Sequence, residues 1–404
     1  MESKISKLKN NTDFFYKKNE NTPRVALCLN FSIEEPEKSA GIHALMSRLF
    51  MQGTKKRSAG QIAEELDAYA IEFSSELKQD YLRFRFVCLN EDFAKALEIM
   101  TDIIKNSTFD EFEKELAKMT GEIVAELDSP RGKVSDAYYK TIFENHPYGN
   151  TYTKILENAE NITKQDVIDA YSKILNESRK VLSFVGDLDI DCILPEIEEN
   201  LGTLPPSVED YSEKDIPVLN EKKIKEIIKP DANQAHLLQG WIVPTYLSKD
   251  YPVLVLLNII LGASGLSSRL FLELRDKKGL AYVVRSTYEP FDLCGSFSIY
   301  IATEPRNIEV SLAGFKEEID KIKNIEVSEE ELHNAKNNII GKWAFMQETN
   351  SQQACLIAHY GIQGLGFDFN EKLKEKILCV TSKQIKDCAN KYFNDNYVLS
   401  VLKP

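Results

Sequence analysis

The alternation of hydrophobic and polar positions along the chain predicts strands and helices in a repeated order. Residues 5–16 and 24–31 are strand-like runs separated by a turn cluster at 19–23, and this pattern predicts a hairpin. Residues 71–77 and 81–88 alternate with a period of two, which is typical of half-buried antiparallel strands. The beginning of the chain is therefore expected to form an antiparallel sheet.

The run 81–88 has two chemically different faces. Its apolar positions fall on one side of the predicted strand: Leu82, Phe84, Phe86 and Cys88. Arg83 and Arg85 fall on the other side, because successive side chains of a strand point to opposite faces. We therefore expect this strand to bury one face and to keep the arginine face polar.

Helical periodicity separates these strands and follows them. An amphipathic helix ending at Gly53-Thr54 is predicted from its apolar positions: Ile42, Leu45, Met46, Leu49 and Phe50. Further helices are predicted over residues 58–69, 91–105, 110–127 and 164–175. A short apolar strand at 179–185 closes this half of the chain.

The second half repeats the order of the first. Strands, helices and a Gly-Ser loop are predicted in turn: strands 224–229 and 234–243, helix 251–261, loop 262–268, helix 269–277, strands 281–288 and 295–303, and a long helix from Ser328. The two long helices also begin alike, with Asp110 or Ser328 as the N-cap and acidic residues in the first turn.

This repetition predicts an α+β fold of two homologous domains, each an antiparallel-rich sheet with helices packed on one face. Pro205-Pro206 and the polar, acidic residues after them have the composition of a linker. We therefore expect an N-terminal domain over residues 1–205, a linker over 206–223 and a C-terminal domain over 224–404.

Composition narrows the class of protein. The 404-residue chain has a net charge of -13, which argues against binding nucleic acid or an anionic membrane. Its longest apolar run, near 251–261, is about eleven residues, short of the roughly 20 that span a bilayer. The N-terminus lacks the apolar region of a secretory signal. The seven cysteines are scattered and never in a Cys-x-x-Cys pair, so we expect core thiols and a cytoplasmic location.

At this point the chain resembles the insulinase (pitrilysin) family of peptidases, and within it the branch of the mitochondrial processing peptidase. The first half carries the resemblance in Gly41-Ile42, Phe50-Met51-Gln52-Gly53-Thr54, Arg57-Ser58, Glu115, Glu122-Ile123 and His146-Pro147-Tyr148-Gly149. The second half carries it in the string from Ser267 to Tyr282, which includes Ser268-Arg269-Leu270-Phe271 and Gly279-Leu280-Ala281. The resemblance implies paired α/β domains that enclose a peptide chamber, formed by two chains or two halves.

Active members of this family bind zinc through H-x-x-E-H and a distal glutamate. On this chain the resemblance places the two histidines at Ala44 and Arg48, the catalytic glutamate at Ser47 and the distal glutamate at Glu122, which is kept. Ala44 has no ligand atom, Ser47 is no base near neutral pH, and the permanent cation of Arg48 repels a metal ion. We therefore expect no metal or cofactor on this chain and no zinc hydrolysis by it alone.

Two hypotheses concern the side chains left at this position. We expect Arg48 to form an ion pair with Glu122 in place of the metal, the alternative being that Arg48 extends to solvent. His43 points about 100° away from the ligand face of the helix and is expected to be a surface or partly buried residue. The five histidines contain no i, i+4 pair, so all are expected to be structural.

The resemblance also implies a role for the second half. In two-chain members of the family, the subunit without zinc supplies an arginine and a tyrosine that contact the substrate backbone. Arg275 and Tyr282 occupy these positions, on either side of a turn at 277–279 where a helix leads into a strand. The alternative is a surface arginine and a core tyrosine. The loop 262–268 lacks the G-x-x-x-x-G-K pattern, so we expect a tight turn before a helix and not a nucleotide site.

We therefore expect a catalytically inactive subunit, not an enzyme on its own, that pairs with a zinc-bearing homologue. Zinc is expected only in that partner, the substrate is expected to be a peptide or unfolded polypeptide, and no nucleic acid or membrane is expected. One alternative is a non-hydrolytic homodimeric or monomeric protein that binds peptides or acts as a scaffold. A further alternative is a peptidase with an unfamiliar metal arrangement.

Overall fold

The computed structural model describes residues 2–209 and 216–404, and the chain divides into two compact units. Unit 1 consists of three segments: Met1–Gly121, Lys154–Glu213 and Ala344–Phe369. Unit 2 consists of Glu122–Thr153, Lys214–Trp343 and Asn370–Pro404. Each unit therefore contains sequence from both sides of the predicted linker 206–223. Residues 210–215 of that linker lie outside the described residues, and the boundary stays a prediction.

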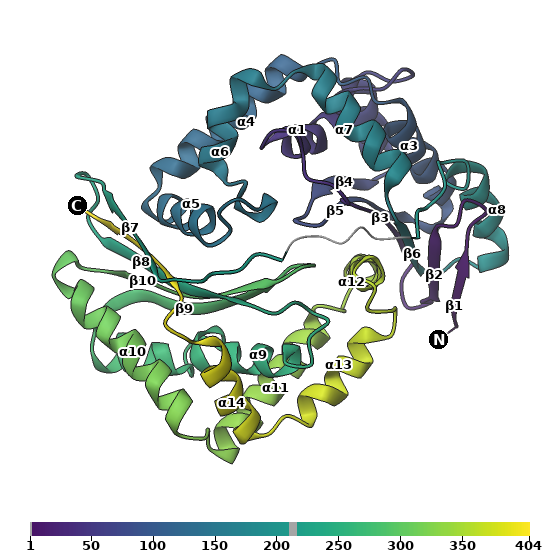
Figure 1. The fold of residues 1–404 in the computed structure, drawn as a ribbon. Coiled ribbons are helices and arrows are strands. Elements are labelled where there is room, and N and C mark those ends of the chain that lie inside the picture. Colours follow the sequence, from purple (N-terminus) through teal and green to yellow (C-terminus); the bar gives the residue numbers. More distant parts are fainter. Residues whose placement is uncertain (1, 210–215) are drawn as a thin grey trace. The chain divides into compact units, whose positions relative to one another are not determined.

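Unit 1 contains a six-stranded sheet in the order β1-β2-β6-β3-β5-β4 (Figure 1). Its strands are β1 (Ser3–Lys7), β2 (Asp13–Lys18), β3 (Arg24–Ser32), β4 (Glu72–Leu77), β5 (Tyr81–Leu89) and β6 (Lys180–Gly186). The pairs are antiparallel except for β2 with β6, which is parallel.

The predicted hairpin of residues 5–16 with 24–31 is wrong. Residues 5–16 contain a turn at Asn11 (φ 62°), so that β1 pairs with β2. The late strand β6 then lies between β2 and β3. Local alternation marks the strands but carries no information on a partner more than 150 residues away.

One face of this sheet packs against helices through aromatic side chains. Phe84 of β5 meets Phe50 of η1 (Phe50–Gln52) at 4.8 Å between ring centroids, and Phe184 of β6 meets Phe93 at 5.6 Å. The helices on this side include α1 (Ile42–Leu49), α3 (Phe93–Asn106) and α7 (Lys164–Glu177) (Figure 1). Unit 1 also contains α2 (Ala59–Ala68) and α8 (Ile190–Asn200).

The opposite face of the sheet carries α12 (Asn350–Ile362), which comes from the second half of the sequence (Figure 1). Small side chains permit close packing: Ala26, Cys28, Val87 and Val185 of the sheet with Ala354 and Ala358 of the helix. Arg83 and Arg85 lie on this face, as predicted. The helix covers Arg83, which is only 9% exposed, so this face is not the polar surface that the alternation indicates.

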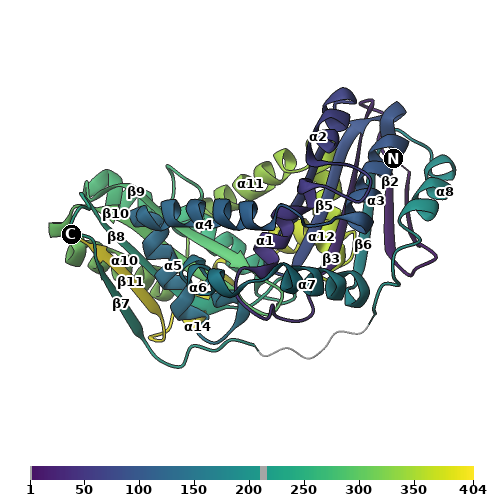
Figure 2. The ribbon, with the colours of Figure 1, turned by 90° about the horizontal axis from the view of Figure 1, so that it is seen from above.

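Unit 2 contains a five-stranded sheet in the order β7-β11-β8-β10-β9, visible along one side of Figure 2. Its strands are β7 (Lys223–Ile228), β8 (Ala235–Val243), β9 (Ala281–Pro290), β10 (Gly295–Thr303) and β11 (Val398–Lys403). β7 with β11 is parallel and the other pairs are antiparallel. This is the pairing pattern of β2 to β6, strand for strand, with β1 as the addition in unit 1. The predicted internal repeat is thereby visible in the topology.

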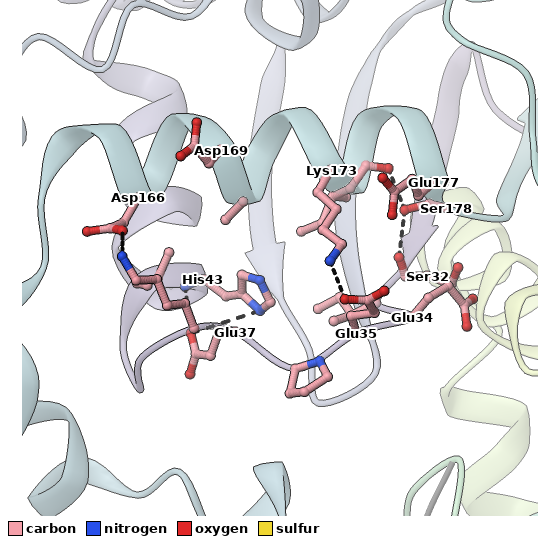
Figure 3. Close-up of a pocket in the computed structure, with 16 residues that line it drawn as sticks. Ser32, Glu34, Glu35, Glu37, His43, Asp166, Asp169, Lys173, Glu177 and Ser178 are labelled. Atoms are coloured by element: carbon pink, nitrogen blue, oxygen red, sulfur yellow. Dashed lines mark hydrogen bonds and ion pairs between the residues drawn. The ribbon is translucent and has the colours of Figure 1, made fainter. Parts of the chain in front are cut away.

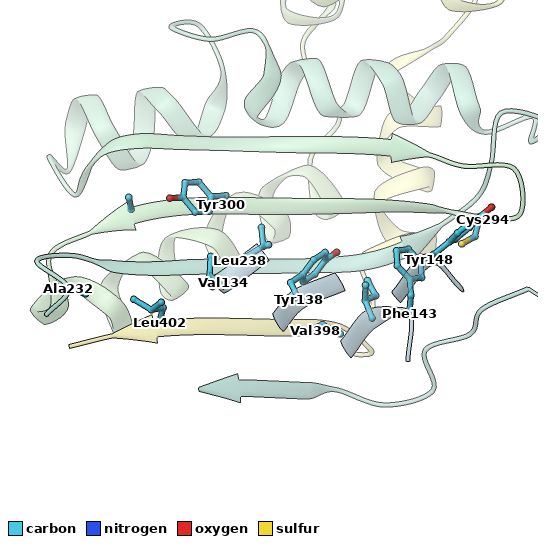
Figure 4. Close-up of a cluster of buried hydrophobic side chains, with 12 residues drawn as sticks. Val134, Tyr138, Phe143, Tyr148, Ala232, Leu238, Cys294, Tyr300, Val398 and Leu402 are labelled. Atoms are coloured by element: carbon cyan, nitrogen blue, oxygen red, sulfur yellow. The ribbon is translucent and has the colours of Figure 1, made fainter. Parts of the chain in front are cut away.

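Helices cover both faces of the second sheet as well. One side carries α9 (Tyr251–Asn258), α10 (Ile308–Asn324), α11 (Glu329–Phe345) and α14 (Ser382–Tyr392) (Figure 1). The other side carries α5 (Pro130–Ile142), from the first half of the sequence, in the cluster drawn in Figure 4. There Tyr138 packs onto Gly240, where a Cβ would approach the phenol oxygen to 2.1 Å. Its hydroxyl bonds the Ser296 hydroxyl at 2.8 Å.

The predicted fold class is confirmed, since both units are α+β and each has an antiparallel-rich sheet with packed helices. The prediction of helices on one face only is wrong, because each sheet has a further helix on its second face, α12 in unit 1 and α5 in unit 2. Across the described residues, every helix is too short or too polar to cross a bilayer.

Candidate functional site

The predicted amphipathic helix is α1, and its start is held by a glutamate just before it. Glu37 accepts backbone N–H bonds from Gly41 (3.1 Å) and His43 (2.8 Å), which satisfies donors that a helix N-terminus leaves open. Gly41 has φ 104°, and a Cβ there would lie 2.8 Å from Ile155. The predicted apolar face is buried, as Ile42, Leu45, Met46 and Leu49 show.

The polar side chains of α1 are engaged in contacts within the protein and do not offer a set of metal ligands. The Ser47 hydroxyl donates to the Ala44 carbonyl at 2.8 Å, within the helix. Arg48 Nε lies 3.3 Å from Oε2 of Glu115, on helix α4 (Phe112–Asp128). Glu115 is 3% exposed, so the guanidinium compensates a buried carboxylate. Glu115 is one of the residues that carry the family resemblance, but nothing in the sequence indicates this role.

The predicted Arg48–Glu122 ion pair stays a prediction, because Glu122 belongs to unit 2 while Arg48 belongs to unit 1. The Glu122 side chain is exposed. His43 is more buried than expected, at 8% exposed, with Nδ1 3.9 Å from Oε2 of Glu37. Burial lowers the pKa of His43 although the Glu37 charge acts in the opposite direction, so the ring is neutral at pH 7.

The zinc ion of the active relatives does not fit the residues present on α1. A methyl group, a hydroxyl bonded to a helix carbonyl and a guanidinium stand where the resemblance places two imidazoles and a carboxylate. Within residues 2–209 and 216–404, no group of three or more His, Cys, Asp or Glu side chains is arranged to hold a metal ion. The chemistry of these side chains therefore supports no metal-dependent step at this position.

A pocket of about 260 Å³ lies beside α1, between residues 32–38 and helix α7 (Figure 3). Its lining includes six carboxylates: Glu34, Glu35, Glu37, Asp166, Asp169 and Glu177. Lys38 bonds Asp166 at 2.6 Å and Lys173 pairs with Glu35, so two cations offset part of this charge. The remaining negative field favours cationic groups. Sequence reasoning missed this pocket because its two acidic segments are about 130 residues apart.

The two candidate substrate-contact residues lie together in unit 2. Arg275 is on η6 (Phe271–Lys277) and Tyr282 is on β9, with Gly279 (φ 63°) in the turn between them. The Arg275 guanidinium carbon lies 4.6 Å from the ring centroid of Phe271 and 4.6 Å from that of Tyr282. Tyr282 is 76% exposed, which excludes the alternative of a core tyrosine. The cation is therefore held between two rings at the surface.

The helices around the Gly-Ser loop differ from the prediction in their conformation. The expected helix 251–261 is α-helical to Asn258 and then π-helical over η5 (Ile259–Ala263), where Ser264 N–H bonds the Ile259 carbonyl five residues earlier. The cause is close packing, because a Cβ on Gly262 would lie 2.1 Å from the Ser286 nitrogen of β9. η6 is π-helical as well, which periodicity alone does not predict.

Exposed apolar side chains lie on the same helix and strand as the Arg275–Tyr282 pair and on the loop before that helix. Leu266 is 72% exposed, and Leu272 and Val283 are each 39% exposed. In the described part of the chain β9 pairs with β10 alone, so β9 is an edge strand. Donors, aromatic rings and a strand edge, with exposed apolar side chains on adjoining elements, are features that an extended peptide uses for binding.

Comparison with known proteins assigns the family. Residues 14–154 match the model described as insulinase (peptidase family M16), and residues 161–339 match the model described as the peptidase M16 inactive domain. The chain belongs to the peptidase M16 family. The resemblance found from the motifs is thereby confirmed, and the model that matches residues 161–339 is the one described as the inactive domain.

Relatives extend over most of the chain. A protein of Rickettsia bellii named as an uncharacterized zinc protease is 28% identical over 90% of this chain and 88% of its own length. The uncharacterized zinc protease YmxG of Bacillus subtilis is 26% identical over 92% of this chain and 90% of its own. A crystal structure of a peptidase M16 inactive domain from Pseudomonas fluorescens superposes with a TM-score of 0.89 at 21% identity, covering 100% of this chain and 98% of its own. The crystal structure of a protease from Helicobacter pylori superposes with a TM-score of 0.90 at 22% identity, covering 100% of this chain and 99% of its own.

Proposed function

We propose that this chain is a catalytically inactive M16 subunit that docks with a zinc-bearing homologue and contributes substrate contacts to the complex. The observation that carries the first part is the ion pair of Arg48 with the buried Glu115. A cation at a ligand position neutralises the carboxylate inside the protein, a role that fits a helix kept for its shape.

The contribution to substrate binding rests on the chemistry of Arg275 and Tyr282. The guanidinium offers several N–H donors in a fixed plane, and the flanking rings limit its rotation, so it is suited to a peptide carbonyl. The exposed phenol of Tyr282 can donate to an oxyanion that develops during cleavage by the partner. The free edge of β9 offers main-chain groups to an extended peptide or unfolded polypeptide.

A second candidate function uses the same surface without hydrolysis. The chain would then act as a homodimeric or monomeric peptide-binding or scaffold protein. The exposed apolar residues beside β9 favour binding in either case, so they do not separate the two functions. The scattered cysteines support a cytoplasmic location for both.

Co-purification and activity measurements separate these functions. We expect the isolated chain to contain less than a tenth of an equivalent of zinc and to cleave no peptide. A homologue with an intact H-x-x-E-H motif from the same cell should co-purify with it and become active on pairing. Peptide binding by the isolated chain with no such partner recovered would support the scaffold function instead.

A further inference from the structure

Two cysteines that are far apart in the sequence meet in the interface between the first sheet and α12. Cys28 on β3 is fully buried, and it packs in one cluster with Ala354 and Ala358. Cys355, the residue after Ala354, packs against the same cluster and is partly exposed. Ser183, directly opposite Cys28 on β6, donates its hydroxyl to the Ala354 carbonyl at 2.7 Å, which fixes this turn of the helix over Cys28.

Two arginines bring positive charge to this interface and donate hydrogen bonds to α12. Arg85 is the cross-strand neighbour of Cys28 and donates to the Ser351 hydroxyl, one turn before Cys355, at 2.6 Å. Arg83 donates to the Cys355 carbonyl at 3.2 Å. The other ionisable groups around Arg83 are Glu76 at 4.0 Å, Tyr81 and His359.

These groups and the difference in burial give the two thiols different pKa values. The neighbouring Cys28 thiol, which itself donates to Asn30 Oδ1 at 3.6 Å, and the charges of Arg83 and Arg85 lower the pKa of Cys355 to about 7, against the effect of burial. Burial raises the pKa of Cys28 well above its ordinary value. A partly exposed thiolate beside a buried, protonated thiol is the arrangement of a reactive cysteine and its resolving partner.

We propose that Cys28 and Cys355 form a reversible disulfide, in which Cys355 reacts first with a peroxide and Cys28 resolves the product. In the first step the Cys355 thiolate attacks one peroxide oxygen, the O–O bond breaks, and hydroxide leaves as Cys355 becomes a sulfenic acid. In the second step the Cys28 sulfur attacks the Cys355 sulfur, the S–O bond breaks, and the Cys28 proton leaves in the water formed. Two electrons pass from the thiols to the peroxide, and a dithiol reductant reverses the reaction.

The consequence of this bond is a covalent tie between α12 and the sheet beneath it. The helix belongs to the segment Ala344–Phe369, which joins unit 1 from the second half of the chain. Oxidation would close a loop of more than 300 residues, and long loops lose the most entropy in the unfolded chain when they are closed. The oxidised protein should therefore resist thermal unfolding better than the reduced protein.

The remaining cysteines provide internal controls. Burial raises the pKa of Cys88 and of Cys388 to about 12, so both remain thiols at neutral pH. Cys88 lies on the same sheet as Cys28 but on its opposite face. Cys192 and Cys379 are exposed, and in the sequence neither has another cysteine within five residues.

The experiment treats the intact chain with hydrogen peroxide in low molar excess at pH 7.5, blocks the remaining thiols and maps peptides by mass without reduction. We expect two of the seven thiols to disappear first, in a linked peptide pair that contains Cys28 and Cys355 and is two hydrogens lighter than its parts. Dithiothreitol should restore all seven. Oxidation of Cys355 to a sulfinic acid with no linked pair, or reaction at Cys192 and Cys379 alone, would overturn the proposal.

Matched variants separate this bond from general oxidation. Cys355→Ser should abolish the linked pair and the rise of several degrees in Tm on oxidation, whereas Cys88→Ser should keep both. Cys355 is partly exposed, so its serine variant is expected to fold. Arg85→Gln should slow alkylation of Cys355 at pH 7 by about three-fold or more, and an unchanged rate would contradict the assigned role of this cation.

Discussion

The guanidinium Nε of Arg48, on the helix where the family resemblance places the zinc ligands, lies 3.3 Å from the carboxylate of Glu115 on α4. Replacing Arg48 with Met should leave a carboxylate that is 3% exposed without this partner. Because Arg48 itself is partly exposed, we expect a loss of about 2 kcal/mol in the free energy of unfolding, less than for a fully buried pair. Urea titration of the wild type and the variant measures this loss.

The control for this change is Lys114→Met. Lys114 on the same helix α4 is paired with Glu111, the residue before that helix, and both side chains are exposed. Exposed pairs of this kind contribute about 0.5 kcal/mol or less. Equal losses in the two variants would show that the Arg48–Glu115 pair has no special role.

Restoring the family motif tests the account of the zinc position. We expect the triple variant Ala44→His, Ser47→Glu and Arg48→His to bind close to one zinc ion per chain, because two imidazoles one helical turn apart then lie on one face of α1. Elemental analysis after dialysis measures the metal content. The single variant Ala44→His is the control, and zinc binding by that variant as tight as by the triple variant would contradict the assignment.

Arg83 provides a test of the interface between α12 and the sheet. It donates to the Tyr81 hydroxyl at 2.9 Å and to the Cys355 carbonyl at 3.2 Å, and it is 9% exposed. We expect Arg83→Met to reduce the free energy of unfolding by about 2 kcal/mol, because buried acceptors lose their donor. Arg24→Met on the neighbouring strand removes a surface pair with Glu72 and should cost about 0.5 kcal/mol or less.

His359 on α12 predicts a pH dependence of stability. Burial, assisted by the charges of Arg83 and Lys78, lowers its pKa to about 4. The unfolded chain binds this proton near pH 6.5 and the folded chain does not, so protonation favours unfolding. This contribution is complete above about pH 6.5, falls by about 2–3 kcal/mol as the pH drops towards 4, and changes no further below that.

The measurement is the difference between wild type and His359→Gln across this pH range. The difference isolates His359 from His43 and His236, whose pKa values are also lowered by burial. A wild-type minus variant difference that stays constant from pH 7 to pH 4 would show that His359 is not held neutral.

Local patterns predicted what depends on neighbours in the sequence. The buried face of α1, the turn at Gly279 and the repeated order of strands all follow from spacing within a few residues. The motifs then indicated the family and the loss of donors at Ala44, Ser47 and Arg48. These features need no knowledge of distant contacts.

What the sequence did not predict depends on such contacts. Nothing near Arg83 indicates that a helix some 270 residues later covers it. The place of β6 beside β2 and the meeting of Cys28 with Cys355 have the same origin. The π-helical turn that contains Gly262 depends on how closely the backbone of β9 approaches it, which no periodicity encodes.

The central claim is that this chain lacks activity of its own and serves a partner through Arg275 and Tyr282. The most direct test is the kcat/KM of peptide cleavage by the complex with a zinc-bearing homologue. We expect Arg275→Ala to lower it by about 10- to 100-fold and Tyr282→Phe, which keeps the ring over the guanidinium, by a smaller factor. Arg306→Ala, at an exposed arginine of the same unit, should leave it unchanged. Full activity of the complex with both Arg275→Ala and Tyr282→Phe, or peptide cleavage by the isolated wild-type chain, would contradict the account.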